Sequence, residues 1–318
     1  MTGDLSMPRN LPDFKGLKLD FDLIDSHHHL FDLDTVYYPW LSDRPESDFL
    51  LGDYESLKKN YLPEDYLSDA DGLRPLRTVH VEAEADHAHP LAETRWLEEV
   101  MKKHPLPNAI VAHAWLHKPE TESILEAQSA FKAVRGIRSK PLTSFTAESR
   151  EDVKGRAGSM QDENWLKGLR LFPKYGFSWD LRVPFWHLQE AAEVCMLLPD
   201  LPVVVEHTGL PWDRSKEGLM EWRKVMKALA ACRNVFLKIS ELGLATAPWD
   251  YNDNRRIVRE ALELFGFDRC MFASNFPVAG LRIDFVSQVK AIAHMVQDCS
   301  REERRALFHD TALKFYRL

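Results

Sequence analysis

The feature that most constrains the fold of this 318-residue chain is an alternation of short apolar segments with longer segments of helical periodicity. The apolar segments lie at about 22–27, 77–83, 109–115, 134–138, 177–183, 201–207, 235–240 and 269–274. Continuous apolar strands separated by helices are typical of a parallel sheet covered on both faces. Eight such repeats favour a closed (β/α)8 TIM barrel, and an open α/β sheet is the alternative.

The spacing of the segments also predicts the domain organisation. No change in composition resembles a linker, so we expect one barrel domain over 20–318, preceded by a polar N-terminal arm over 1–19. Long connections follow the first strand, at about 32–61, and the fourth strand, at about 139–159. Loops of this length are usually functional or disordered. The aromatic residues of the first, among them Trp40, predict an ordered flap over the strand ends.

Composition and charge narrow the range of partners and compartments. The net charge of −8 comes without a strongly basic run, which argues against nucleic acid or an anionic membrane as the main partner. No secretory signal and no long apolar run is visible, and the four cysteines form no C-x-x-C pair. We therefore expect a cytoplasmic protein with reduced thiols, and a small molecule met by a few local arginines as its partner.

The first apolar segment ends in three consecutive histidines. Alternate side chains of a strand share a face, so His27 and His29 are expected to point the same way and His28 the other way. Two imidazoles that converge at a strand end can hold a divalent metal or bind an anionic oxygen. The structural alternative is a half-buried cluster whose hydrogen bonds are all satisfied.

Polar residues stand in or at the ends of nearly all the other predicted strands, where a TIM barrel carries its chemistry. They are Glu82, His113, Arg138, Asp180, His207, Lys238, Ser240, Ser274 and Asn275. In a closed barrel Lys238 is expected to be interior and paired. Strand alternation turns Glu206 away from His207, which makes Glu206 the less expected inward group. Each residue alone could be a satisfied polar group, but together they favour a functional site.

Sequence blocks at these strand ends match those of a known enzyme family in the same order. The blocks are D-S-H-x-H-x-F at 25–31, Y-P-W-L at 38–41, V-H-V-E-A at 79–83, R-G-I-R at 135–138, S-x-D-L at 178–181, V-V-V-E-H-T-G-L-P at 203–211, N-V-F-L-K-I-S at 234–240 and R-C-M-F-A-S-N-F-P-V at 269–278. They resemble the amidohydrolase-related (family 2) hydrolases of the L-fuconolactonase and 2-pyrone-4,6-dicarboxylate lactonase group. The resemblance implies a TIM barrel that hydrolyses a lactone or related ester.

One position departs from the family pattern. The family's eighth-strand block often carries an aspartate that acts as general base, and Asn275 stands at that position here. A neutral amide cannot take a proton at ordinary pH, so this role is not carried over, although Asn275 can still orient water or bind substrate. The candidate replacement bases are Asp180, Glu82, Glu206 and a histidine that holds no metal.

The resemblance leaves two forms of the site open. In one, His27, His29 and His207 hold a divalent metal such as zinc, with Glu82 as a possible fourth ligand. In the other, the same histidines polarise the lactone carbonyl and stabilise the oxyanion without a metal. The loss of the aspartate removes one anionic ligand and so weakens the metal form.

These inferences combine into one functional prediction with two alternatives. The catalytic set is predicted to be His27, His29, His207, Asn275 and Asp180. The substrate contacts are predicted to be Arg138, Lys238, Glu82, Trp40 and Ser240. Arg138 and Lys238 would hold a substrate carboxylate, and a homodimer is a family-level expectation. The alternatives are a metal-dependent decarboxylase or C–C hydrolase of an aromatic acid, and a catalytically impaired barrel that binds a small molecule.

Overall fold

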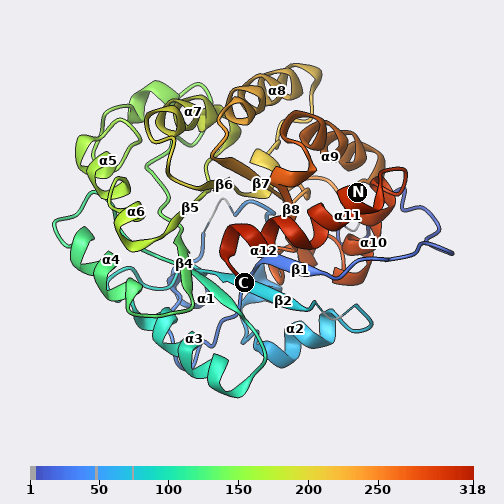
Figure 1. Cartoon of the computed structure of the whole chain (residues 1–318), viewed down its shortest axis with the longest axis horizontal. Coiled ribbons are helices and arrows are strands. Elements are labelled where there is room, and N and C mark those ends of the chain that lie inside the picture. The colour runs from blue at the N-terminus through green and yellow to red at the C-terminus, as the bar shows by residue number, and fades with distance from the viewer. Residues whose placement is uncertain (1–4, 47–48, 74) are drawn as a thin grey trace.

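The chain folds into a ring of eight parallel strands surrounded by helices (Figure 1), in a computed structural model that describes residues 5–46, 49–73 and 75–318. The strands pair in sequence order around the ring. They are β1 (Ile24–His28), β2 (Arg77–Val81), β3 (Ala109–Ala112), β4 (Val134–Ile137), β5 (Ser178–Leu181), β6 (Val203–Val205), β7 (Val235–Ile239) and β8 (Cys270–Phe272). The ring closes where His28 pairs with Phe276 and where the His29 N–H donates to the Phe276 carbonyl at 2.7 Å. The predicted TIM barrel is confirmed.

The helices cover the outside of the ring and one of its ends. They are α1 (Pro39–Ser42), α2 (Pro63–Asp69), α3 (Ala92–Lys103), α4 (Thr121–Ser129), α5 (Glu163–Leu169), α6 (Phe172–Tyr175), α7 (Leu188–Leu197), α8 (Lys216–Ala231), α9 (Tyr251–Phe265), α10 (Phe285–Met295), α11 (Arg301–Arg305) and α12 (Thr311–Tyr316). Ser215, Asp250 and Asp284 cap α8, α9 and α10 by accepting backbone N–H bonds. Among the described residues, none of these helices combines the length and the apolarity that a membrane crossing requires.

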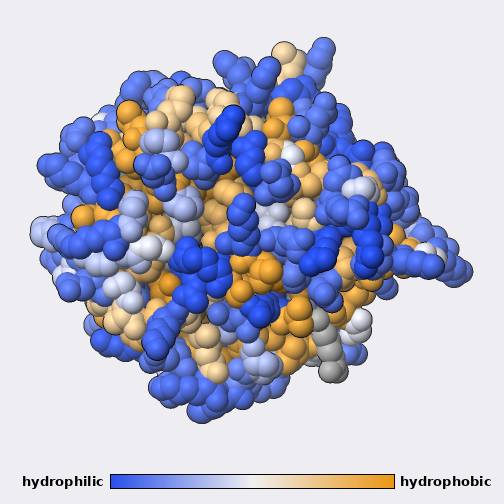
Figure 2. Space-filling model, in the orientation of Figure 1, coloured by the Kyte–Doolittle hydropathy of each residue, from blue (hydrophilic) through white to orange (hydrophobic). Residues whose placement is uncertain are grey.

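The amino end of the barrel is sealed by α12, which lies across the ring in Figure 1. Phe315 and Tyr316 pack into a buried cluster with residues from the start of the strands, such as Ile24, Ala109 and Met271. The Tyr316 hydroxyl donates to Asp180 Oδ2 at 2.5 Å inside the ring. In the same orientation, hydrophilic side chains cover much of the surface, with hydrophobic atoms showing between them (Figure 2). The amino end of the barrel is therefore closed by α12, and the open end is the carboxyl end of the strands.

The long connection after β1 is anchored at both ends over that open end. Phe31 and Tyr61 exchange two backbone hydrogen bonds of 3.0 and 2.9 Å. Trp40 donates its indole N–H to the Ala83 carbonyl at 2.8 Å, and its ring stacks on Phe49 at 5.5 Å. Residues 47 and 48 of this flap lie outside the described residues.

Two further segments pack against the barrel. In the connection after β4, the Ser144 N–H donates to His187 Nε2 at 2.9 Å, and His187 Nδ1 contacts Glu190 at 2.7 Å. This contact fastens the connection to the start of α7. In the N-terminal arm, the Arg9 N–H donates to the Trp249 carbonyl at 2.7 Å. Residues 1–4 of the predicted arm lie outside the described residues.

Gly168 lets α5 approach the chain that follows β3. A Cβ atom on Gly168 would lie 2.4 Å from the Leu116 carbonyl oxygen, a backbone atom that cannot rotate away. We expect Gly168→Ala to lower the free energy of unfolding by about 1–3 kcal/mol, although alanine is the better helix former. Urea unfolding measures this change. Gly280→Ala is the control, because its Cβ would meet only Phe276 at 3.5 Å; equal losses in both variants would contradict the packing argument.

Candidate active site

The two histidines at the end of β1 converge inside the barrel. The pairing register shifts between Asp25 and His28, a bulge that turns His27 inward. His27 Nε2 and His29 Nε2 are 3.2 Å apart. His28 points the other way, where its Nε2 contacts the Thr78 hydroxyl at 2.9 Å. The expected alternation of the three histidines is therefore present.

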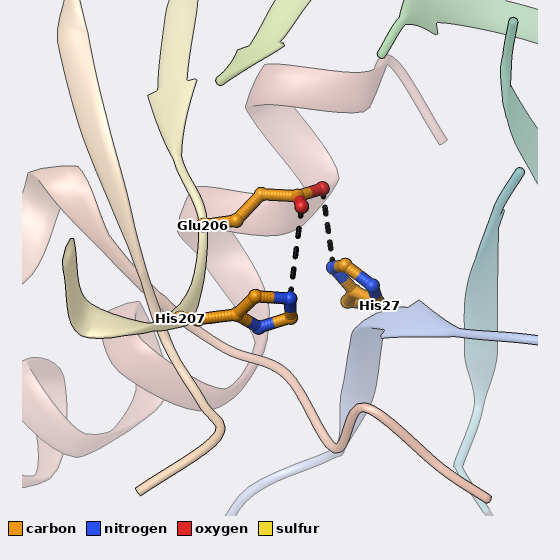
Figure 3. A group of neighbouring side chains, drawn as sticks. All are labelled: His27, Glu206 and His207. Atoms are coloured by element: carbon orange, nitrogen blue, oxygen red, sulfur yellow. Dashed lines mark ion pairs between the residues drawn. The ribbon is translucent and has the colours of Figure 1, made fainter. Parts of the chain in front are cut away.

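Glu206 lies inside the barrel between two histidines (Figure 3). Its carboxylate is 3.3 Å from His27 Nδ1 and 3.7 Å from His207 Nε2. The expectation that Glu206 points away from the site is therefore wrong. Glu206 follows the inward residue Val204 by two positions, and it is His207 that breaks the alternation, because a positive φ of 56° turns the chain there.

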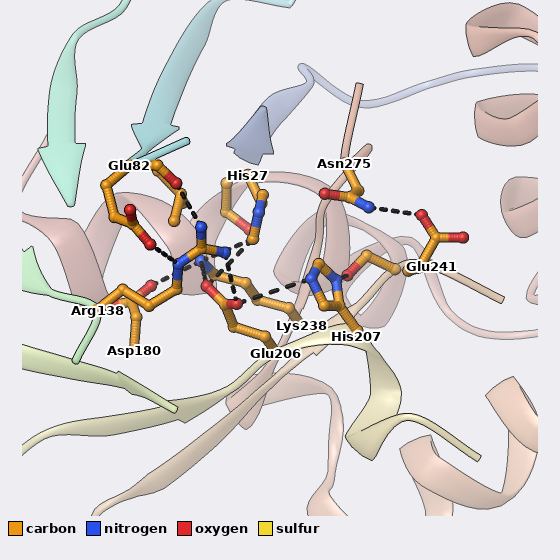
Figure 4. Close-up of polar contacts among 12 residues, drawn as sticks. His27, Glu82, Arg138, Asp180, Glu206, His207, Lys238, Glu241 and Asn275 are labelled. Atoms are coloured by element: carbon orange, nitrogen blue, oxygen red, sulfur yellow. Dashed lines mark hydrogen bonds and ion pairs between the residues drawn. The ribbon is translucent and has the colours of Figure 1, made fainter. Parts of the chain in front are cut away.

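Two cations share the Glu206 carboxylate beneath the cavity (Figure 4). Arg138 donates to Glu206 Oε2 at 3.2 Å and also pairs with the Glu82 carboxylate. Lys238 donates to Asp180 Oδ2 at 2.7 Å and lies 3.7 Å from Glu206 Oε1. Burial alone would raise the pKa of Glu206, but Arg138 and Lys238 hold it at about 2. Both cations are thus neutralised by the protein itself.

A cavity of about 100 Å³ lies at the carboxyl end of the strands. Five of the residues predicted from sequence line it: His29, Trp40, Arg138, His207 and Asn275. The other five lie outside its lining and are buried: His27, Glu82, Asp180, Lys238 and Ser240. Ser240 holds the imidazole of His207, with 3.1 Å between Oγ and Nδ1. The predicted contact between Lys238 and a substrate carboxylate has no support here, because the Lys238 side chain is fully buried and its ammonium is bonded to Asp180.

Sequence reasoning missed four charged residues of the cavity wall, of which Glu46 lies in the flap. The other three, Glu84, Lys140 and Arg182, each stand two positions after a residue that had been singled out directly after β2, directly after β4 or within β5. Strand alternation carried one step past the strand end would have found them. Lys140 forms an ion pair with Glu84.

A further missed residue, Glu241, contacts the cavity through Asn275. The Asn275 amide donates to Glu241 Oε2 at 2.5 Å. Burial raises the pKa of the Glu241 carboxyl to about 7. Glu241 has a positive φ of 42°, an unfavourable conformation for this residue type that the sequence does not signal.

The hydrogen bonds of His29 define its tautomer. Burial lowers the pKa of His29 to about 3, so the ring is neutral. Its Nδ1 lies 2.8 Å from the Val81 carbonyl, which can only accept, so Nδ1 carries the hydrogen. Nε2 is therefore unprotonated, and it faces Asn275 Oδ1 at 3.1 Å.

The atoms around His29 Nε2 fit a divalent cation. His29 Nε2 and Asn275 Oδ1 are two acceptors in contact. His27 Nδ1 accepts from the Lys238 ammonium at 3.4 Å, so His27 Nε2 carries its hydrogen toward His29 Nε2 and would become a third ligand atom only in the other tautomer of His27. Zinc sites in proteins typically combine histidine nitrogens with oxygen ligands. The second ring nitrogen of each such histidine is typically held by a carboxylate or a carbonyl, as it is in His29. His27 and His207 also form, with Glu206, a group of ligand atoms within 4.8 Å of one another.

A second group of ligand atoms does not fit a metal. Glu82, His87 and His113 lie within the same distance of one another. However, the rings of His87 and His113 stack in parallel, 4.0 Å apart and inclined by 2°. Lone pairs in parallel planes do not converge on one ion, and Glu82 is already paired with Arg138.

Removal of the Glu206 charge tests the ion network. We expect Glu206→Gln to lower the free energy of unfolding by about 3–5 kcal/mol, because Arg138 and Lys238 stay buried with less counter-charge. Thermal and urea unfolding measure the loss. Glu99→Gln is the control, since Glu99 pairs with Lys102 on the surface and should leave the midpoints unchanged. A Glu206 variant as stable as the Glu99 variant would contradict this account.

Buried histidines also predict an acid-sensitive fold. Burial lowers the pKa of His27, His28, His29, His80, His113 and His207. These rings stay neutral in the folded chain, and below about pH 6.5 they gain protons on unfolding. Their contribution to the free energy of unfolding therefore falls as the pH falls. Burial raises the pKa of four carboxyls: that of Asp180, that of Asp25 to about 6, that of Glu241 to about 7 and that of Glu93 to about 8. These carboxyls act in the opposite direction.

Because the histidines outnumber these carboxyls, unfolding takes up protons in this range. We expect the free energy of unfolding to rise from pH 5 to pH 7, by about 1.4 kcal/mol per pH unit for each net proton. Urea titrations at fixed pH, with a chelator present to remove metal, measure the slope. A flat or falling profile would contradict the neutral state of the buried histidines.

Comparisons with known proteins show relatives over most of the chain. The chain is 37% identical over 303 residues to the uncharacterized protein y4mH of Sinorhizobium fredii (strain NBRC 101917 / NGR234), covering 94% of this chain and 99% of the relative. It is 26% identical over 315 residues to an L-fucono-1,5-lactonase of Burkholderia multivorans (strain ATCC 17616 / 249), covering 93% of this chain and 96% of that protein.

Solved structures share the fold at low identity. An amidohydrolase from Burkholderia multivorans with bound zinc superposes with a TM-score of 0.74 at 23% identity, covering 93% of this chain and 99% of that chain. A 5-carboxyvanillate decarboxylase from Novosphingobium aromaticivorans, complexed with manganese, superposes with a TM-score of 0.62 at 15% identity over the whole of both chains. A family model described as amidohydrolase matches residues 24–318. Because this match takes in the entire barrel, the chain belongs to the amidohydrolase family of hydrolases, as the resemblance of its strand-end motifs predicted.

Proposed function

We propose that this enzyme hydrolyses a lactone, or a related ester, of a small carboxylic acid. The observation that carries the proposal is the set of neutral polar groups around one cavity: the imidazoles of His29 and His207 and the amide of Asn275. Such groups suit attack by water on a carbonyl carbon. The names of the L-fucono-1,5-lactonase relatives support the same reaction class.

In this proposal Arg138 binds the carbonyl oxygen. Three of its N–H groups are held by the Glu82 carboxylate, the Glu82 backbone carbonyl and Glu206. A guanidinium has five donors, so two remain for a substrate oxygen at the cavity wall. The two carboxylates keep this cation in place, and negative charge that develops on the carbonyl oxygen is stabilised without rearrangement.

When no metal is bound, His29 accepts a proton from the water that attacks the carbonyl carbon, and it returns this proton to the ring oxygen as the acyl C–O bond of the lactone breaks. Its Nε2 is unprotonated, and the bond from Nδ1 to Val81 fixes the ring. Asn275 Oδ1, 3.1 Å away, accepts the second hydrogen of the water and orients it. Among the candidate bases, Asp180 is bonded to Lys238 and Tyr316, and Glu82 and Glu206 are paired with Arg138. A divalent ion held by His27, His29 and Asn275 would supply a Lewis acid for the carbonyl and for water.

Removal of either cavity imidazole tests the reaction. In assays with a panel of lactones, we expect His29→Ala and His207→Ala each to lower kcat/KM by about 100- to 10,000-fold. His104→Ala, a change at the surface, is the control and should keep full activity. Unchanged hydrolysis in both cavity variants, with the fold intact by circular dichroism, would remove the assigned roles.

Metal content separates the two forms of the site. After incubation with zinc and gel filtration, we expect up to one zinc ion per chain by elemental analysis, and a lower content in His29→Ala. Lactone hydrolysis before and after chelation then shows which form acts. Zinc retained equally by wild type and His29→Ala would place the ion elsewhere.

A metal-dependent decarboxylase is the second candidate. The similar fold of the manganese-containing decarboxylase and the donor set around His29 favour it. Incubation with aromatic acids and Zn²⁺ or Mn²⁺ should release CO₂ if this candidate holds. Tight binding of acids or lactones without turnover would instead indicate a catalytically impaired barrel.

A further inference from the structure

The side-chain amide of Asn275 has an orientation that His29 does not explain. The Asn275 backbone is held, because its N–H donates to the His27 carbonyl at 2.8 Å and its carbonyl accepts from Ala279 at 3.0 Å. The amide oxygen Oδ1 faces the unprotonated Nε2 of His29 at 3.1 Å, so two acceptors meet. Rotation of the amide by half a turn would exchange its oxygen and nitrogen, and Nδ2 could then donate to His29. His29 alone therefore favours the opposite orientation.

Glu241 accounts for the observed orientation. Its Oε2 accepts from Asn275 Nδ2 at 2.5 Å, and Figure 4 shows the amide nitrogen turned toward Glu241 and the amide oxygen turned away from it. In the rotated amide, Oδ1 would instead face the carboxylate oxygen, which is a second acceptor. A hydrogen bond from an N–H to a carboxylate is also stronger than one to a neutral acceptor such as imidazole. The contact with Glu241 therefore outweighs the contact that the rotated amide would form with His29.

The position of Glu241 is costly for the fold. The residue is 3% exposed, and its positive φ is unfavourable for a glutamate. Arg282 attracts the carboxyl group, but its guanidinium donates to backbone carbonyls, and among the described residues it forms no ion pair with Glu241. Gly243 leaves room for the side chain, since a Cβ atom there would lie 3.0 Å from Glu241 Oε1. A glutamate kept in such a place indicates a role beyond stability.

We infer that Glu241 is a positioning residue, which binds the Asn275 nitrogen and thereby turns the Asn275 oxygen toward His29. Asn275 lines the cavity, and Glu241 is not among the described residues of that lining, so Glu241 acts on a ligand through Asn275. The inference rests on the proposed function for the use of Asn275 Oδ1, which there accepts a hydrogen of the attacking water. The amide at position 275 and the carboxylate at position 241 thus act as one unit.

Kinetic constants for the lactone that the wild type hydrolyses fastest test this role. We expect Glu241→Met to lower kcat by about 10- to 100-fold and to change KM by less than about threefold, because the rotated amide no longer orients the water. Glu241→Gln keeps an acceptor oxygen and should recover most of the loss. Glu260→Met, which removes a carboxylate that pairs with Arg223 outside the barrel, is the control and should leave kcat unchanged. An unchanged kcat in Glu241→Met, or equal losses in Glu241→Met and Glu241→Gln, would overturn the inference.

An exchange of the two side chains tests the contact itself, and it keeps the inference testable if Glu241→Met does not fold. Asn275→Asp brings two carboxylates into contact and should lower the melting temperature. Adding Glu241→Gln restores one donor and one acceptor, so the doubly substituted protein should regain part of this loss. A double variant that melts no higher than Asn275→Asp would overturn the inference.

A spectroscopic measurement separates this inference from the proposed function, because it needs no turnover. In protein labelled with ¹⁵N-histidine, with a chelator present, the Nε2 resonance of His29 is assigned by its loss in His29→Ala. We expect this resonance to move to lower frequency in Glu241→Met, because the rotated Asn275 amide then donates to Nε2. It should stay in place in Glu260→Met. A moved resonance in Glu241→Met supports the inference even if no lactone is hydrolysed, and an unmoved one overturns it whatever the result of the lactone assays.

Discussion

The buried carboxylate of Glu206 is the group on which the interior of this barrel depends. It lies within 4 Å of Arg138, Lys238, His27 and His207, which come from four different strands or their ends. Removing so many cationic and polar groups from water is costly, and Glu206 offsets that cost only because it is itself ionised, with a pKa of about 2. The network therefore sets the charge state of the site: the carboxylates and cations are charged in pairs, and the imidazoles beside them are neutral.

This pairing decides which side chains can act on a ligand. Lys238 and Asp180 neutralise each other beneath the cavity. Arg138 lines the cavity, and its position there is fixed by ion pairs with two carboxylates. At one side of the cavity His29 presents its unprotonated Nε2, beside His27 Nε2 and Asn275 Oδ1. Arg182 lines the same cavity, and among the described residues its guanidinium has no hydrogen bond and no ion pair. Some polar residues of this interior therefore support the site through contacts with one another, and others can contact a ligand. The two sets look alike in the sequence.

The sequence predicted the barrel because eight apolar segments leave little choice of architecture, and it predicted His27, His29, Arg138 and His207 because polar residues at strand ends converge. It failed where the backbone leaves the regular strand conformation. His207 and Glu241 have positive φ angles, so strand alternation misplaced Glu206 and gave no sign of Glu241. Sequence also could not tell an arginine that is paired from one that is not. That difference between Arg138 and Arg182 depends on distances to carboxylates from other strands.

The seal formed by α12 has a consequence for biosynthesis. Tyr316 comes after all eight strands in the chain, yet its hydroxyl bonds to Asp180, which holds Lys238 beside His27. A nascent chain that contains all eight strands still lacks Tyr316, and without it Asp180 would lose a hydrogen-bond donor and the apolar cluster around Ile24 would face water. Completion of the barrel interior therefore depends on α12, at the end of the ring opposite the cavity.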